Sequence, residues 1–191
     1  LRPLASDFSV KDAAKVVSLM DSDDAVDVLE TLDDKKKYEI VENLDKAAIK
    51  DVKMLLSYDD DEIGSLITTN YICIRENLTI REAMHELVRQ AGENDNISTI
   101  YVVNDKGCFC GAIDLKDLIV ARENVELKTL ISYAYPYLYD NEKISDSVVK
   151  IKDYAEDSLP VLNRKKKMVG IITAQDVIET VDDEMGDDYA K

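Results

Sequence analysis

The stretch STIYVVNDKGCFCGAIDLKDLIVA (residues 98–121) aligns without a gap on DSLPVLNRKKKMVGIITAQDVIET (residues 157–180). Identical pairs include Val102/Val161, Asn104/Asn163, Gly111/Gly170, Ile113/Ile172 and Asp117/Asp176. Upstream, NLTIREAM (77–84) matches NEKISDSV (141–148). The first copy then has about five more residues than the second, near GENDN (92–96). The last two thirds of the chain therefore contain an internal repeat.

Each copy predicts the same order of elements: strand, helix, strand, polar turn, strand, helix. The strands are predicted from β-branched and aromatic runs bounded by turn residues, and the helices from apolar residues at i, i+3 and i+4. The predicted strands are 71–75, 99–103 and 108–113 in the first copy, and 137–139, 158–162 and 168–172 in the second. The predicted helices are 79–90, 115–122, 144–154 and 174–181.

The first third has a different period, of 12 residues, between about residue 9 and residue 57. The apolar series Met20, Leu32, Leu44 and Leu56 follows this period, and an Asp comes directly after each of the first three. Asp is a preferred N-cap, so each period predicts a cap, a helix of about nine residues and a turn. Helices this short are unstable alone in water and must stack, either as a small α-solenoid or as one irregular helical bundle.

Composition narrows the classes of function. The 191 residues include 24 basic and 40 acidic ones, a formal charge of −16. That balance argues against nucleic-acid binding and against docking on an anionic membrane surface, and favours cations or a basic partner. Three cysteines predict reduced thiols rather than a disulfide framework. No apolar run approaches the ~18–20 residues that a membrane-spanning helix needs.

Two acidic segments stand out. Residues 57–70, SYDDDEIGSLITTN, are predicted to be a solvated linker. The chain end, from residue 176 on, is predicted to begin as a helix and carries Asp176, Glu179, Asp182, Asp183, Glu184, Asp187 and Asp188. Like charges at helical spacing destabilise one another unless a cation neutralises them, and clustered carboxylates suit Mg²⁺ or Ca²⁺. The alternative is a solvated acidic helix end.

Each copy of the repeat resembles a cystathionine-β-synthase-type (CBS) domain. That family's defining segment, Gly-hydrophobic-x-Thr/Ser-x-x-Asp, is complete in the second copy from Gly170 through Thr173 to Asp176. The first copy runs from Gly111 to Asp117 and has Asp114 where a hydroxyl residue is expected. Tandem CBS domains form a compact pair, and such pairs commonly dimerise.

The order of parts resembles the cytosolic region of MgtE-type magnesium transporters. The connector matches that family at Leu56, Ser57, Tyr58, Gly64, Leu66, Thr68 and Thr69. The resemblance implies an α+β fold with an all-helical superhelical N-terminal domain (1–63), two CBS domains of α/β repeats (64–130 and 131–181) and the start of an acidic plug helix (182–191). It also implies that a membrane domain, absent here, follows Lys191, and that this region lies at the cytoplasmic face of the membrane.

In that family the cytosolic region senses Mg²⁺, which bridges carboxylates of the helical domain, the second CBS copy and the plug helix and so closes the pore. The resemblance places metal ligands at Asp21, Ala25 (through its carbonyl), Asp176, Glu179, Glu184, Asp187 and Asp188. For Asp21, a structural role as an N-cap is the alternative.

A second class of function is an adenine-nucleotide sensor, with ATP held by Thr173 and Asp176. A third is an interaction scaffold whose acidic faces dock a basic protein. We also expect a homodimer, because helix faces such as Ile80, Met84 and Leu87 would be left uncovered in one module. No enzyme is expected, since the lone His85 lacks the second histidine of a zinc-protease helix and no phosphate-cradling loop is present.

Overall fold

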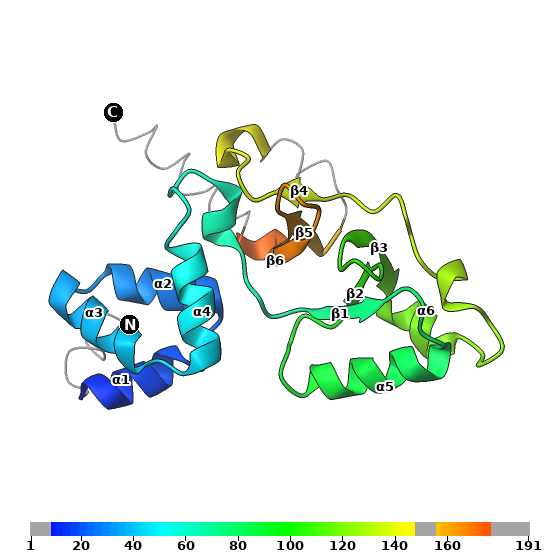
Figure 1. Cartoon of the computed structure of the whole chain (residues 1–191), viewed down its shortest axis with the longest axis horizontal. Coiled ribbons are helices and arrows are strands. Elements are labelled where there is room, and N and C mark those ends of the chain that lie inside the picture. The colour runs from blue at the N-terminus through cyan, green and yellow to red at the C-terminus, as the bar shows by residue number, and fades with distance from the viewer. Residues whose placement is uncertain (1–8, 148–155, 177–191) are drawn as a thin grey trace.

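The computed structural model describes residues 9–147 and 156–176. The first third forms four short helices: α1 (Val10–Val17), α2 (Ser22–Glu30), α3 (Asp34–Asn43) and α4 (Lys46–Leu55). Their N-caps are Ser9, Asp21, Asp33 and Asp45, which recur at the 12-residue period. α1 packs against α3, and α2 packs against α4 (Figure 1). The prediction of stacked short helices is confirmed.

The first CBS copy contains β1 (Ile72–Arg75), α5 (Ile80–Ala91), β2 (Thr99–Val103), β3 (Phe109–Asp114) and α6 (Leu115–Val120). The second contains β4 (Leu138–Tyr139), β5 (Ser158–Leu162) and β6 (Met168–Thr173). In each sheet the first strand is parallel to the second, and the second is antiparallel to the third. Residues 144–147 and 174–176 are helical, and the rest of the two predicted helices lies outside the described residues.

The segment that precedes each CBS copy pairs with the sheet of the other copy. Thr68, which precedes the first copy, forms an antiparallel bridge with Ile171 of β6 in the second. Ser132, which precedes the second copy, bridges Ala112 of β3 in the first. Both bridges lie beside the glycine shared by the two copies. A Cβ on Gly170 would lie 2.8 Å from the Thr68 carbonyl oxygen, and one on Gly111 would lie 2.5 Å from that of Ser132. The repeated glycine is therefore explained by close backbone approach.

The connector between the helices and the first copy is not a solvated linker, and that prediction was wrong. It includes the 3-10 helix η1 (Ile63–Leu66), and Ile63 and Ile67 are buried. The Gly64 N–H donates to the Asp140 carbonyl oxygen at 2.8 Å. In Figure 1 this segment runs from α4 past the β4–β6 sheet before it reaches β1. The acidic residues of this segment made it look solvated, although its apolar residues are buried against the second copy.

The helix face that motivated dimerisation is also placed differently from the prediction. Ile80 and Leu87 are buried in the core of the first CBS copy itself, and Met84 packs against that core. The exposed apolar side chains of this copy include Val88 on α5 and Ile119 on α6. The helical spacing of these apolar residues was predicted correctly, but they form the face of α5 that packs on the sheet of its own copy.

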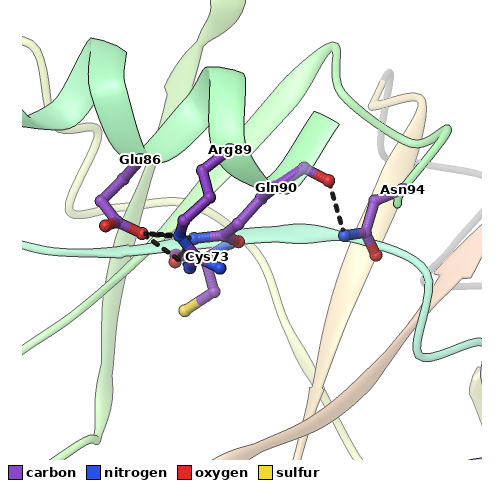
Figure 2. A network of polar contacts seen from close by, with 5 residues as sticks. All are labelled: Cys73, Glu86, Arg89, Gln90 and Asn94. Carbon is purple, nitrogen blue, oxygen red and sulfur yellow. Dashed lines mark hydrogen bonds and ion pairs between the residues drawn. The ribbon is translucent and has the colours of Figure 1, made fainter. Parts of the chain in front are cut away.

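The outer edge of β1 is closed by a side chain (Figure 2). The Gln90 amide accepts a hydrogen bond from the Cys73 N–H at 3.0 Å and donates one to the Cys73 carbonyl oxygen at 2.9 Å. Gln90 thus satisfies backbone groups that an additional strand would otherwise pair with. Burial raises the pKa of the Cys73 thiol to about 11, which keeps it protonated and unreactive.

Candidate metal centre between the helical domain and the second CBS copy

The N-terminus of α2 carries two of the predicted ligands. Asp21 is the N-cap, but its side chain makes no capping hydrogen bond. Instead its Oδ1 accepts a hydrogen bond from Asn70 Nδ2 of the connector at 2.8 Å. Ala25 lies one turn later, with its side chain buried and its N–H donating to the Asp21 carbonyl oxygen. The Asp21 side chain therefore holds the connector rather than capping its own helix.

Asp176 lies just after β6, in the second copy's defining segment. Its Oδ2 accepts hydrogen bonds from the Thr173 N–H at 2.8 Å and from Thr173 Oγ1 at 2.7 Å. The Asp176 N–H in turn faces Thr173 Oγ1 at 3.3 Å. Thr173 and Asp176 therefore form a reciprocal cap at the start of this helix. The Thr173 hydroxyl and the Asp176 carboxylate of the motif are therefore hydrogen-bonded to each other.

Asp23, which sequence reasoning missed, faces Asp176 from the helical domain. Its pKa is raised to about 6, first by burial and then by the negative charge of Asp176. Hydrogen bonds from the backbone N–H groups of Asp23 and Asp24 act in the opposite direction, but they do not outweigh these two effects. Asp23 Oδ1 is buried and has no hydrogen-bond partner within residues 9–147 and 156–176. A carboxylate of the helical domain and one of the second CBS copy thus lie close enough here for their charges to repel each other.

The other predicted sites, Glu179, Glu184, Asp187 and Asp188, lie outside the described residues. In the first copy, Asp114 is the N-cap of α6 and accepts a hydrogen bond from the Lys116 N–H at 2.7 Å. The only hint of Asp23 in the sequence is its place in the run Asp21-Ser22-Asp23-Asp24, where nothing separates it from its acidic neighbours.

The charges suit a cation that requires few protein ligands. Among the described residues, no group of three or more acidic, histidine or cysteine side chains is arranged to hold a metal. Mg²⁺ usually keeps several waters and is often bound through only one or two carboxylates. A bridge between Asp23 and Asp176 has that composition. The arrangement therefore fits a hydrated, weakly held Mg²⁺ better than a closed protein cage.

Two family models match the chain. The model of the MgtE intracellular N domain matches residues 2–61, and that of the CBS domain matches residues 63–124 and 127–183. The chain belongs to the CBS-domain proteins and matches the cytosolic part of MgtE transporters. The predicted order of an MgtE-type helical domain followed by two CBS copies is confirmed.

Curated relatives agree. The chain is 30% identical to the magnesium transporter MgtE of Thermus thermophilus over 174 residues, which are 91% of this chain and 39% of that protein. It is 27% identical to MgtE of Bacillus subtilis over 182 residues, 94% of this chain and 40% of that protein. The chain thus spans about two fifths of these relatives. The prediction that it is not an enzyme agrees with their description as transporters.

Solved structures show the same fold. The crystal structure of the soluble part of a magnesium transporter superposes with a TM-score of 0.89 at 30% identity, covering 94% of this chain and 70% of that one. The cytosolic domain of the Mg²⁺ channel MgtE in complex with ATP gives a TM-score of 0.80 at 27% identity, covering 93% and 78%. No helix within the described residues is long and apolar enough to cross a membrane.

Proposed function

We propose that this chain is the Mg²⁺-sensing regulatory region of an MgtE-type magnesium transporter, and that shared Mg²⁺ ions hold its helical domain against its second CBS copy. The observation that supports this most directly is that Asp23 is partly buried where the negative charge of Asp176, across the boundary between these parts, raises its pKa. Repulsion between the two carboxylates disfavours contact between the helical domain and the second CBS copy. A divalent cation bound between the carboxylates attracts both and so favours that contact. The closed state then binds Mg²⁺ better than the open state, which is the condition for a ligand to shift the equilibrium.

Asp23 extends the set of ligands taken from the family resemblance. Asp21 and Ala25, the ligands implied by the resemblance, lie on the same first turns of α2 as Asp23. Glu179 would follow Asp176 by one helical turn if the helix continues as predicted. Glu184, Asp187 and Asp188 remain proposed ligands of the plug helix, which would join the bridge to the pore of the membrane domain.

The proposal is tested by small-angle scattering of the chain from zero to about 20 mM Mg²⁺, against KCl of matched ionic strength. We expect the radius of gyration to fall with Mg²⁺ and not with KCl. The variant Asp23→Asn should lose most of this response. Equal compaction by both salts would remove the proposal, because general screening would then account for the change.

A second candidate ligand is ATP, since a relative of this chain was crystallised with it. Thr173 and Asp176 already bond to each other, so a nucleotide at that motif must displace this contact. It would also compete with Mg²⁺ for Asp176. Calorimetric titration of the wild-type chain and of Thr173→Ala with ATP tests whether ATP binds at this motif. An equal affinity of both for ATP would mean that any nucleotide binds elsewhere.

The proposed assembly is a homodimer through the first CBS copy, joined to a membrane domain at the cytoplasmic face of the membrane. Val88, Ile119 and Val120 are 69%, 59% and 67% exposed, and they lie on α5 and α6, which pack side by side. A second copy would cover this apolar surface. Light scattering at tens of micromolar protein tests the dimer directly, and a monomeric mass would reject it.

A further inference from the structure

Asn70 joins three parts of the chain. Its Nδ2 donates to Asp21 Oδ1 of the helical domain at 2.8 Å. Its Oδ1 accepts from the Asp95 N–H at 2.6 Å, and its carbonyl oxygen accepts from Asn96 Nδ2 at 2.9 Å. Asp95 and Asn96 belong to the loop between α5 and β2 of the first CBS copy. The Asn70 side chain thus accepts a hydrogen bond from the first CBS copy and donates one to the helical domain.

That loop, residues 92–96, is the segment that the first CBS copy has and the second lacks. It is anchored on its own domain, because Asn94 Nδ2 donates to the carbonyl oxygen of Gln90 in the last turn of α5 at 2.9 Å (Figure 2). Gln90 is in turn fixed to β1 through Cys73. The extra residues therefore give the first copy a loop that is hydrogen-bonded to its own helix and reaches Asn70.

The neighbouring residue strengthens the junction. Thr69 Oγ1 donates to Asp51 Oδ2 of α4 at 2.9 Å, and the Thr69 N–H donates to Ser22 Oγ of α2 at 3.1 Å. Thr68, one residue earlier, is bridged to β6. Three consecutive connector residues thus reach the second copy, the helical domain and the first copy. Asp21, Asp51, Asn70 and Asp95 also line a single cleft of about 330 Å³.

We propose that Asn70, supported by the loop 92–96, is the positioning residue that holds the N-terminus of α2 in place and so presents Asp23 to Asp176. Asp21 and Asp23 lie two residues apart at the start of α2, so a bond that holds Asp21 also holds the backbone from which the Asp23 side chain extends. The Asn70–Asp21 bond opposes the repulsion between Asp23 and Asp176. Its strength therefore sets the Mg²⁺ concentration at which the domains close; this last step rests on the proposed function, whereas the positioning role does not.

The test is Asn70→Asp. Aspartate has the shape of asparagine and keeps an acceptor for the Asp95 N–H, but it turns the donor facing Asp21 into a second carboxylate. Asn77→Asp is a matched control, because Asn77 Nδ2 donates to Asp105 Oδ1 at 2.9 Å and both residues lie within the first CBS copy. The distance between the helical domain and the second copy is measured with spin labels on α3 and on the β5–β6 turn.

In Mg²⁺-free KCl we expect Asn70→Asp to lengthen this distance and Asn77→Asp to leave it unchanged. Adding Asp21→Asn to Asn70→Asp restores the hydrogen bond with the roles exchanged, and should restore the distance. The Mg²⁺ midpoint of closure should rise about tenfold in Asn70→Asp, as expected for loss of a hydrogen bond to a charged group.

An unchanged distance in Asn70→Asp, or failure of the exchanged pair to restore it, would overturn the positioning role. If the wild-type chain shows no response to Mg²⁺ but Asn70→Asp still separates the domains, the proposed sensing function falls and the positioning role stands. Circular dichroism of each variant confirms that the domains themselves remain folded.

Discussion

Replacing Asp23 with asparagine should stabilise the chain in the absence of Mg²⁺. The pKa of Asp23 is raised from 3.8 to about 6 in the folded chain, so its ionised form is disfavoured there. A shift of this size corresponds to about 3 kcal/mol, and screening by solvent at this partly exposed site lowers the useful figure to about 2 kcal/mol. Asparagine removes the charge and keeps an acceptor for the N–H groups of the first turn.

The sign of the pH dependence follows from the same shift. Between pH 3.8 and about 6 the folded chain holds a proton on Asp23 that the unfolded chain has released. The contribution of Asp23 to stability is therefore greatest in its protonated form and is lost as pH rises through about 6. At pH 7.5 the penalty is fully present, which is where Mg²⁺ is expected to offset it.

The assay is thermal unfolding at pH 7.5 and pH 5.0, in EDTA and in about 10 mM Mg²⁺, enough to fill a weak carboxylate site. For a chain of this length, about 2 kcal/mol raises Tm by roughly 4–8 °C. Asp23→Asn should gain this in EDTA at pH 7.5 and should respond less than the wild type to Mg²⁺ and to acid. Asp34→Asn, an exposed acid in the first turn of α3, is the control. A lower Tm for Asp23→Asn in EDTA, or an undiminished Mg²⁺ response, would refute the reasoning.

Three further predictions concern the fold and assembly. Gly170→Ala should cost about 2–4 kcal/mol in urea unfolding, because its Cβ would lie 2.8 Å from the Thr68 carbonyl oxygen and nearby backbone must shift. Tyr101→Phe should cost about 1–2 kcal/mol by the same measurement, since it leaves the buried Ser158 hydroxyl without its 2.6 Å partner; no loss would show that another group replaces this bond. Val88→Glu should give a monomeric mass in light scattering, and a retained dimer would move the interface away from α5.

Periodicity predicted the repeating parts because their burial repeats with them. The caps Asp21, Asp33 and Asp45 recur every 12 residues, and the helices pack in alternate pairs, α1 on α3 and α2 on α4. The strands of the two CBS copies begin and end within one or two residues of the predicted bounds. Local pattern and tertiary packing agree in these segments, so the pattern was sufficient.

The connector and the candidate site depend on contacts between residues far apart in sequence. Ile63 and Ile67 lie within an acidic, polar segment, and their burial requires the second CBS copy, which begins some 70 residues later. Asp23 is chemically indistinguishable from Asp24 in the sequence, and it is set apart by its burial and by its approach to Asp176. A sequence pattern reports the period of an element, but it does not report which other element lies against it.

The pairing of each preceding segment with the other copy explains why the second CBS copy, rather than the first, receives the helical domain. The segment that precedes the second copy follows directly after the first copy, so its bridge at Ser132 connects only the two copies to each other. The segment that precedes the first copy continues from α4, so its bridge at Thr68 ties the helical domain to β6. β6 ends at Thr173, which fixes Asp176. The same strand therefore anchors the connector in its middle and presents the carboxylate at its end, so any movement of the helical domain relative to β6 changes the separation of Asp23 and Asp176.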